Sequence, residues 1–138
     1  MSGGAGGRGP ALVGAGPIIR VSLRGDPAAA GAVLDACRST GTTGLLVHSD
    51  LDAIELARAA TARGIRVPED LALVSYDDEE AHRGDPPLTA VRPVKGQIGR
   101  MAVEMMVARL TEGARRPANR LLLVPELIVR GSSVARSH

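Results

Sequence analysis

Apolar positions recur along the chain in two alternating patterns. Short and nearly continuous aliphatic runs, which are typical of buried strands, occupy residues 18–23, 44–48 and 71–75. Between these runs, residues 27–39 and 51–61 carry apolar side chains at helical spacing. We therefore predict the order strand, helix, strand, helix, strand over residues 18–75.

Residues with strong positional preferences mark the predicted helix ends. Asp26-Pro27 is typical of an N-cap followed by proline at the first helical position, and Ser49-Asp50 offers a second cap. Gly64 follows the last turn of the second helix, as a C-terminal glycine does. The apolar spacing predicts that one face of this helix holds Leu51, Ile54, Ala57 and Thr61.

This order of elements predicts the fold class. Strands and helices that alternate with short joints are typical of right-handed βαβ units. Strands that are aliphatic throughout suit a sheet covered by helices on both faces. We predict an α/β fold with a doubly wound parallel sheet.

The C-terminal part is less regular. Residues 77–85 are acidic and polar, and residues 86–89 are expected to be extended because a residue before proline is pushed out of the helical region. A helix is predicted from Lys95 to Glu112, followed by two short apolar runs at 121–124 and 127–129.

Composition narrows the class of protein. A length of 138 residues favours a single domain, and 17 Lys and Arg against 15 Asp and Glu do not demand a nucleic-acid surface. With one Tyr and no Trp or Phe, the core must be aliphatic. The single cysteine, Cys37, excludes an intramolecular disulfide and a cysteine-based metal site.

The same sequence gives expectations about compartment and boundaries. Residues 1–16 are rich in Gly and Ala and are predicted to be a flexible leader, with the folded lobe over 17–138. The leader lacks the apolar stretch of a secretory signal, and the longest apolar runs are too short to span a bilayer. We therefore expect a cytoplasmic protein without a membrane partner.

Candidate chemistry lies where the parallel strands end, because open α/β sheets bind ligands there. Asp50 has two equal interpretations: it caps its helix, or it also accepts hydrogen bonds from the hydroxyls of a polyol. The acidic segment 77–80 is a candidate cation or acid–base site, but a solvated turn is favoured. An enzyme using Asp50 or Asp77 with His48 is a weaker alternative. No nucleophile elbow or phosphate loop is present, so we expect no enzyme, cofactor or metal.

Several motifs in one order resemble a known family. Residues 64–78, GIRVPEDLALVSYDD, resemble a signature of the lactose/galactose repressor (LacI/GalR) family of bacterial transcription regulators. The resemblance continues upstream in LLVHSD (45–50) and downstream in PPLT (86–89), Gly99 and the segment 125–133.

The resemblance implies a fold and a function. The chain is similar to the C-terminal lobe of a two-lobed, periplasmic-binding-protein-like (type I) sensor, with residues 90–113 crossing to a missing N-terminal lobe. It implies the effector-sensing and dimerisation part of a transcriptional repressor, truncated of its helix-turn-helix. Operator DNA would then be bound only through that absent domain. The alternative is a stand-alone module that binds a small sugar-like molecule without regulating DNA.

The resemblance also implies site residues. Asp50 matches the family aspartate that accepts hydrogen bonds from a sugar or nucleobase-like effector, and Asp77 and Asp78 match the turn after the third strand. For this turn a structural role with contact at the rim of the cleft is favoured.

The chain departs from the family pattern in two places. Gly4 and Arg8 stand where the family has a clamping arginine and an aromatic residue, so we expect sugar binding weaker than is usual in the family. Pro93 and Lys95 stand where some relatives place an aromatic or amide side chain near the ligand.

The missing lobe has a physical consequence. The apolar face of the helix over 95–112, with Met101 and Met105, would lose its covering and invite association. We expect this helix to dock on its own lobe or on another chain. The family resemblance also predicts a homodimer, for which the helix over 51–63 is a second candidate surface.

Overall fold

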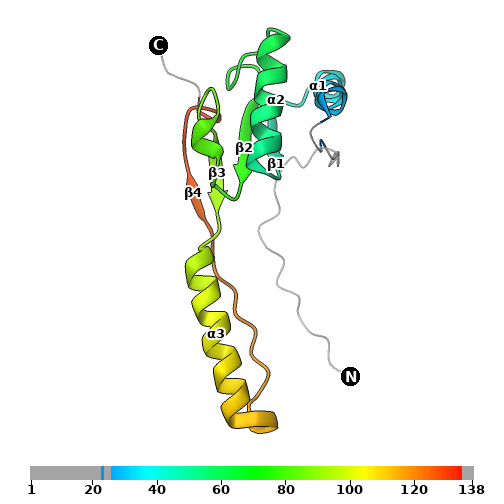
Figure 1. Ribbon diagram of the computed structural model, residues 1–138. Coiled ribbons are helices and arrows are strands. Elements are labelled where there is room, and N and C mark those ends of the chain that lie inside the picture. The colour runs from blue at the N-terminus through cyan, green and yellow to red at the C-terminus, as the bar shows by residue number, and fades with distance from the viewer. Residues whose placement is uncertain (1–22, 24–25, 135–138) are drawn as a thin grey trace, which may run out of the picture.

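The computed structural model describes Leu23 and residues 26–134. These residues form a compact head, residues 26–94 and 126–134, from which an arm of residues 95–125 projects (Figure 1). The predicted leader and all of the predicted strand over 18–23 except Leu23 lie outside the described residues. Leu23 itself is buried in the core of the head.

The head is built on a sheet of four strands in the order β1-β2-β3-β4: β1 (Gly44–Val47), β2 (Ala72–Tyr76), β3 (Thr89–Arg92) and β4 (Glu126–Ile128). The first three strands are parallel, as predicted, whereas β4 is antiparallel to β3. The arm explains this difference. The chain leaves the end of β3 into the arm and returns beside it, so β4 enters the sheet at the end where β3 left it (Figure 1).

Two helices of the head have bounds within one residue of those predicted. In α1 (Pro27–Thr40), the Asp26 carboxylate accepts a hydrogen bond from the N–H of Ala28 at 2.9 Å, which confirms the predicted N-cap. The second helix, α2 (Asp50–Ala62), is followed by Gly64, whose φ of 72° is the left-handed conformation that favours glycine.

The buried face of α2 differs from the prediction. Ile54 and Ala57 are buried as expected, but Leu51 is 65% exposed and Thr61 is also exposed. The face that α2 turns toward the core consists largely of alanine, because small side chains let the helix approach its neighbours closely. Its buried apolar residues are Ala53, Ile54, Leu56, Ala57 and Ala60.

The core is aliphatic, as the composition predicts. Cys37 lies within it as a small buried side chain, and burial raises the pKa of its thiol. The buried apolar residues, from α1, α2, the strands and the connecting segments, are Leu23, Ala30, Leu34, Cys37, Ala53, Ile54, Leu56, Ala57, Ala60, Leu71, Leu73, Ala81, Leu88 and Ala90.

The segment after β4 contributes one buried hydroxyl that forms hydrogen bonds with two strands of the sheet. Ser132 is fully buried, and its hydroxyl donates a hydrogen bond to the carbonyl of Leu73 at 2.6 Å. The same oxygen accepts the N–H of Thr89 at 2.8 Å. Ser132 therefore connects β2 to the start of β3, which assigns a structural role to this residue of the segment 125–133.

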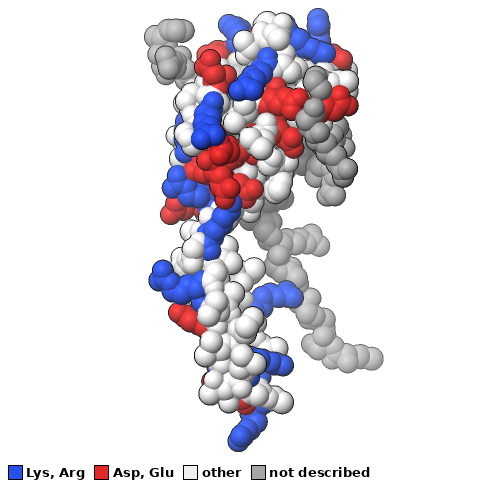
Figure 2. Space-filling model, viewed as in Figure 1, with Lys and Arg blue, Asp and Glu red and all other residues white. Residues whose placement is uncertain are grey.

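The arm contains α3 (Lys95–Glu112), which has the predicted bounds, and the short helix η2 (Gly113–Arg115). No residue of α3 is buried, and the helix points away from the head with the returning chain beside it (Figure 1). The expectation that α3 docks on its own lobe is therefore wrong. The arm leaves Ile98, Val103, Met106, Val107 and Leu110 exposed, and much of its visible surface carries no charge (Figure 2).

Two negative findings apply to the described part of the chain. None of its helices is long and apolar enough to cross a membrane. Within the same residues, no group of three or more His, Cys, Asp or Glu side chains is placed to hold a metal ion.

The orientation of α2 gives a test on two leucines of one helix. Leu56 is 1% exposed, so Leu56→Ala should lower the free energy of unfolding by about 2–5 kcal/mol in urea denaturation. Leu51→Ala is the matched control and should change it by about 0.5 kcal/mol or less, because that side chain is already in solvent. Equal losses in the two variants would contradict the observed orientation of α2.

Candidate functional site

The candidate site lies at the edge of the sheet where the parallel strands end. β1 is followed by His48, Ser49 and Asp50, and β2 by Asp77 and Asp78. Contacts between these segments bring all three predicted carboxylates, those of Asp50, Asp77 and Asp78, to this edge. The arm leaves the head at the same edge (Figure 1).

Asp50 is the first residue of α2 and is only 3% exposed. Its Oδ2 accepts hydrogen bonds from the N–H groups of Glu79, Glu80 and Ala81, at 2.7, 2.9 and 3.2 Å. The interpretation of Asp50 as a cap of its own helix is therefore wrong. The carboxylate instead holds the turn that leads from β2 into the short helix η1 (Ala81–Arg83), because that turn presents three consecutive N–H groups to it.

The environment of Asp50 keeps it ionised. Burial raises the pKa of this carboxyl, but the nearby Ser75 hydroxyl and the backbone N–H groups of the turn lower it further, so the pKa lies below the ordinary value of 3.8. Asp50 Oδ1 and the Ser75 hydroxyl are both buried, and neither makes a well-formed hydrogen bond within the described residues. The charge of Asp50 is thus held mainly by the turn.

Asp78 forms ion pairs with two arginines. Its side chain is 1% exposed and forms ion pairs with Arg130, which follows β4, and with Arg92 at the end of β3, at 2.6 Å for Arg92. The hydrogen bond from Arg130 lowers the pKa of Asp78, burial raises it, and Arg92 lowers it again. Asp78 therefore joins the turn to β3 and β4.

Asp77 is the accessible carboxylate of the three. Its side chain is 35% exposed, and its Oδ1 lies 3.4 Å from Nζ of Lys95. Its φ is 107°, a left-handed value that is strained for a residue with a Cβ, and its N–H donates to the carbonyl of Val91 at 2.9 Å. Strained backbone of this kind clusters at functional sites, so Asp77 is the strongest candidate for contact with a ligand.

An aromatic pair borders the same edge. The rings of His48 and Tyr76 are stacked, with centroids 5.1 Å apart and planes inclined by 22°. His48 is exposed and lies at the rim, while Tyr76, the only tyrosine of the chain, is half-buried. The local sequence pattern does not indicate that the two rings are neighbours. Their proximity follows from the parallel register, because Val47 lies opposite Ser75 and the next residues, His48 and Tyr76, are therefore neighbours.

Lys95 is a second residue whose ion-pair partners the local sequence does not indicate. It is the first residue of α3, and its Nζ lies 2.6 Å from Oε1 of Glu79 in addition to the contact with Asp77. Lys95 is separated from Asp77 and Glu79 by β3, so no local pattern in the sequence indicates that they are in contact.

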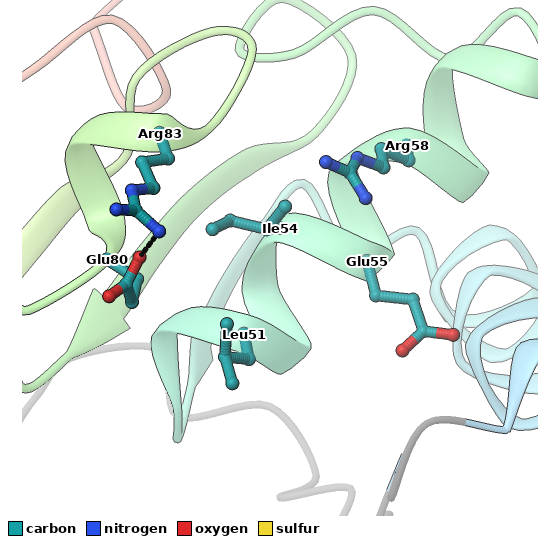
Figure 3. A pocket seen from close by; sticks show the side chains of 6 residues that line it. All are labelled: Leu51, Ile54, Glu55, Arg58, Glu80 and Arg83. Carbon is teal, nitrogen blue, oxygen red and sulfur yellow. Dashed lines mark ion pairs between the residues drawn. The ribbon is translucent and has the colours of Figure 1, made fainter.

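A hollow of about 410 Å³ opens beside this region, between the outer face of α2 and η1. Figure 3 shows its lining, in which Glu80 pairs with Arg83 at 2.7 Å. Asp50 is not part of the lining, which consists of Leu51, Ile54, Glu55, Arg58, Glu80 and Arg83. The surface thus combines an exposed leucine with charges of both signs.

Residues 15–133 match the model of one protein family, the periplasmic binding protein-like domain. The chain is 43% identical over 115 residues to an uncharacterized HTH-type transcriptional regulator of Streptomyces limosus, covering 81% of this chain and 31% of that protein. It is 39% identical over 94 residues to the HTH-type transcriptional repressor PurR of Haemophilus influenzae (strain PittEE), covering 65% and 28%. The chain therefore spans about a third of the length of these relatives.

Solved structures show the same likeness. The transcriptional regulator CelR in complex with cellobiose matches with a TM-score of 0.67 and 35% identity, over 78% of this chain and 32% of that one. The Lac repressor dimer bound to operator and the anti-inducer ONPF matches with a TM-score of 0.63 and 29% identity, over 78% and 38%.

The contact between Asp50 and the turn can be tested by stability. Asp50→Asn should lower the free energy of unfolding at pH 7 by about 1.5–3 kcal/mol, because the charged acceptor of three backbone N–H groups is lost. Asp52→Asn, in the same first turn, is the matched control and should cost about 0.3–1 kcal/mol through the helix dipole.

The pH dependence of this loss follows from the direction of the pKa shift. Because folding lowers the pKa of Asp50, its stabilisation is present above the unfolded pKa of about 3.9 and is lost as the pH falls through the folded pKa. The difference between the parent protein and Asp50→Asn should therefore shrink as urea denaturation is repeated below about pH 4. A difference that stays constant down to pH 2 would contradict the assignment.

Proposed function

Since the chain belongs to the periplasmic binding protein-like domain family, among the LacI-family transcription regulators, we propose that it is the effector-sensing and dimerisation part of a DNA-binding repressor. The observation that carries the proposal is the family match over residues 15–133, together with the similarity of this chain to proteins named as HTH-type regulators. The chain spans about a third of their length, so DNA binding is assigned to a part of such a protein outside this chain. A regulator of this kind acts in the cytoplasm, where its operator is.

We propose that the effector contacts Asp77 at the carboxyl edge of the strands. Its carboxylate is the accessible one, whereas those of Asp50 and Asp78 are buried and hold the turn on which Asp77 lies. The prediction that Asp50 and Asp78 also contact the effector stays a prediction, and their burial favours a supporting role. A carboxylate acceptor suits a small molecule with hydroxyl or amine donors, of the sugar or nucleobase type.

The arm suggests where the other half of the cleft belongs. α3 has no buried residue and exposes an apolar face, which a stable isolated lobe does not need. We propose that residues 90–113 cross to an N-terminal lobe that covers this face and closes the cleft over Asp77.

An open reading frame upstream of Met1 that encodes a helix-turn-helix in frame would support this regulator. Its absence from the genome would favour the stand-alone sugar-like binding module.

The outer face of α2 is the proposed dimer surface. Leu51 is 65% exposed and borders the hollow of Figure 3 beside Ile54. Glu55 and Arg58 on α2 and the Glu80–Arg83 pair on η1 supply both charges within one patch. A patch that carries both signs can pair with its own copy across a twofold axis, because each acid can meet a base of the partner.

Ligand binding tests the site. Isothermal titration calorimetry with cellobiose, lactose and hypoxanthine as probes should show Asp77→Asn binding about tenfold to a hundredfold more weakly than the parent, through a lost charge-assisted hydrogen bond. Asp50→Ala should weaken binding to a similar extent, because the turn loses its support. Asp85→Asn, an exposed carboxylate outside the site, is the control and should bind like the parent. Unchanged binding by Asp77→Asn, or no binding of any probe by the parent, would count against this effector site.

Sedimentation equilibrium tests the dimer surface with two exposed leucines. Leu51→Glu should convert a dimer of the full chain to a monomer, because it buries a charge opposite its own copy. Leu110→Glu, near the end of α3 and 80% exposed, should leave the dimer intact. The reverse result would show that the chains associate through the arm, and a monomeric parent would contradict a dimer formed by this lobe alone.

A further inference from the structure

The head and the arm are joined by ion pairs at the point where the chain passes between them. Lys95, the first residue of α3, contacts Glu79 at 2.6 Å and Asp77 at 3.4 Å. At the same end of the sheet, Arg92 at the end of β3 contacts Asp78 at 2.6 Å and Glu126, the first residue of β4, at 3.8 Å. Acidic side chains gather on the head just above the start of α3 (Figure 2).

The two sets of pairs differ in what they connect. Arg92 joins residues that all belong to the head. Lys95 belongs to the arm, whereas Asp77 and Glu79 belong to the turn that Asp50 holds by three backbone hydrogen bonds. Lys95 therefore links a turn of the head that is held by hydrogen bonds to a helix in which no residue is buried.

We propose that Lys95 is a positioning residue that couples occupancy of Asp77 to the orientation of the arm. This inference rests on the proposed function in that Asp77 is taken as the carboxylate that meets the effector. The arm in turn is the element that leads toward the rest of a longer regulator, so its orientation is what an occupied site would change.

The distances show how the coupling works. Lys95 shares its ammonium between two carboxylates, and the contact with Asp77 is the longer one. A ligand that donates hydrogen bonds to Asp77 competes with this longer contact and leaves Lys95 with Glu79 alone. The ammonium then moves toward Glu79, and α3 moves with it. By linkage, whatever fixes the arm in one orientation changes ligand affinity at Asp77 by the same factor.

An exposed ion pair contributes little to folding stability, but this does not prevent Lys95 from orienting the arm. Lys95 is about half exposed, and pairs of this kind add little to folding stability. Orientation of the arm is a different quantity, because α3 has no buried residue that would oppose a small bias. The hydrogen bond that Lys95 donates to Glu79 and the charge of Asp77 raise the pKa of Lys95 above 10.5, so its charge is present throughout the neutral range.

The test measures the orientation directly and needs no ligand. Spin labels on the full chain at Arg38→Cys in α1 and Leu110→Cys in α3, in a Cys37→Ala background, report the distance from head to arm by pulsed electron paramagnetic resonance. Labelled chains are diluted with unlabelled ones to remove distances between copies. The parent should give one narrow distribution, and Lys95→Met should lose that narrow peak.

Three further variants separate positioning from simple packing. Lys95→Arg keeps the charge and should restore the narrow distribution. Glu79→Gln should shift the distribution, and Asp77→Asn, which mimics a carboxylate whose charge is engaged, should shift it by less. In 1 M salt the parent should broaden toward Lys95→Met, which should itself change little.

Identical distributions for the parent, Lys95→Met and Asp77→Asn would overturn the inference, as would a loss in Lys95→Met that Lys95→Arg does not restore. Neither result bears on the proposed effector contact, which is judged by calorimetry at Asp77. Equally, a failure of ligand binding would leave the distances between head and arm unchanged.

Discussion

One buried carboxylate organises the functional edge of this lobe. Asp50 begins α2 and accepts three consecutive N–H groups from the turn after β2. The contact joins two βα connections that are far apart in the sequence, and it gives the acidic segment 77–80 a defined shape although Glu79 remains exposed. A charged acceptor is needed, because three N–H groups aimed at one point are satisfied best by an anion.

The shape of the turn gives Asp77 and Asp78 different environments. Asp78 points into the head, where Arg130 and Arg92 neutralise it, and Asp77 is left at the surface with a strained backbone. Burial and charge therefore divide three neighbouring acids into two that support and one that is accessible. The same turn reaches the arm through Lys95, so the shape of the site and the direction of the arm share one element.

Much of the fold could be predicted from local pattern. Asp26, Pro27 and the apolar spacing give α1, and the span of α3 from Lys95 to Glu112 follows from its spacing and from Gly113. The antiparallel direction of β4 could not be predicted, because it depends on the path of the arm. The buried face of α2 was misjudged because its alanines pack more closely than its leucine at 51. The sequence predicts a candidate site at the strand ends, and the structure brings its three carboxylates to that edge. The different roles of Asp50, Asp77 and Asp78 could not be predicted, because they depend on contacts across the fold.

Amide hydrogen exchange at Glu79, Glu80 and Ala81, measured by NMR, is the sharpest test of the contact between Asp50 and the turn. If the Asp50 carboxylate holds these three N–H groups, they should exchange slowly in the parent protein and become fast together in Asp50→Asn, while the amides of α1 keep their protection. Fast exchange of all three in the parent, or protection that survives in Asp50→Asn, would contradict the central role given to this contact.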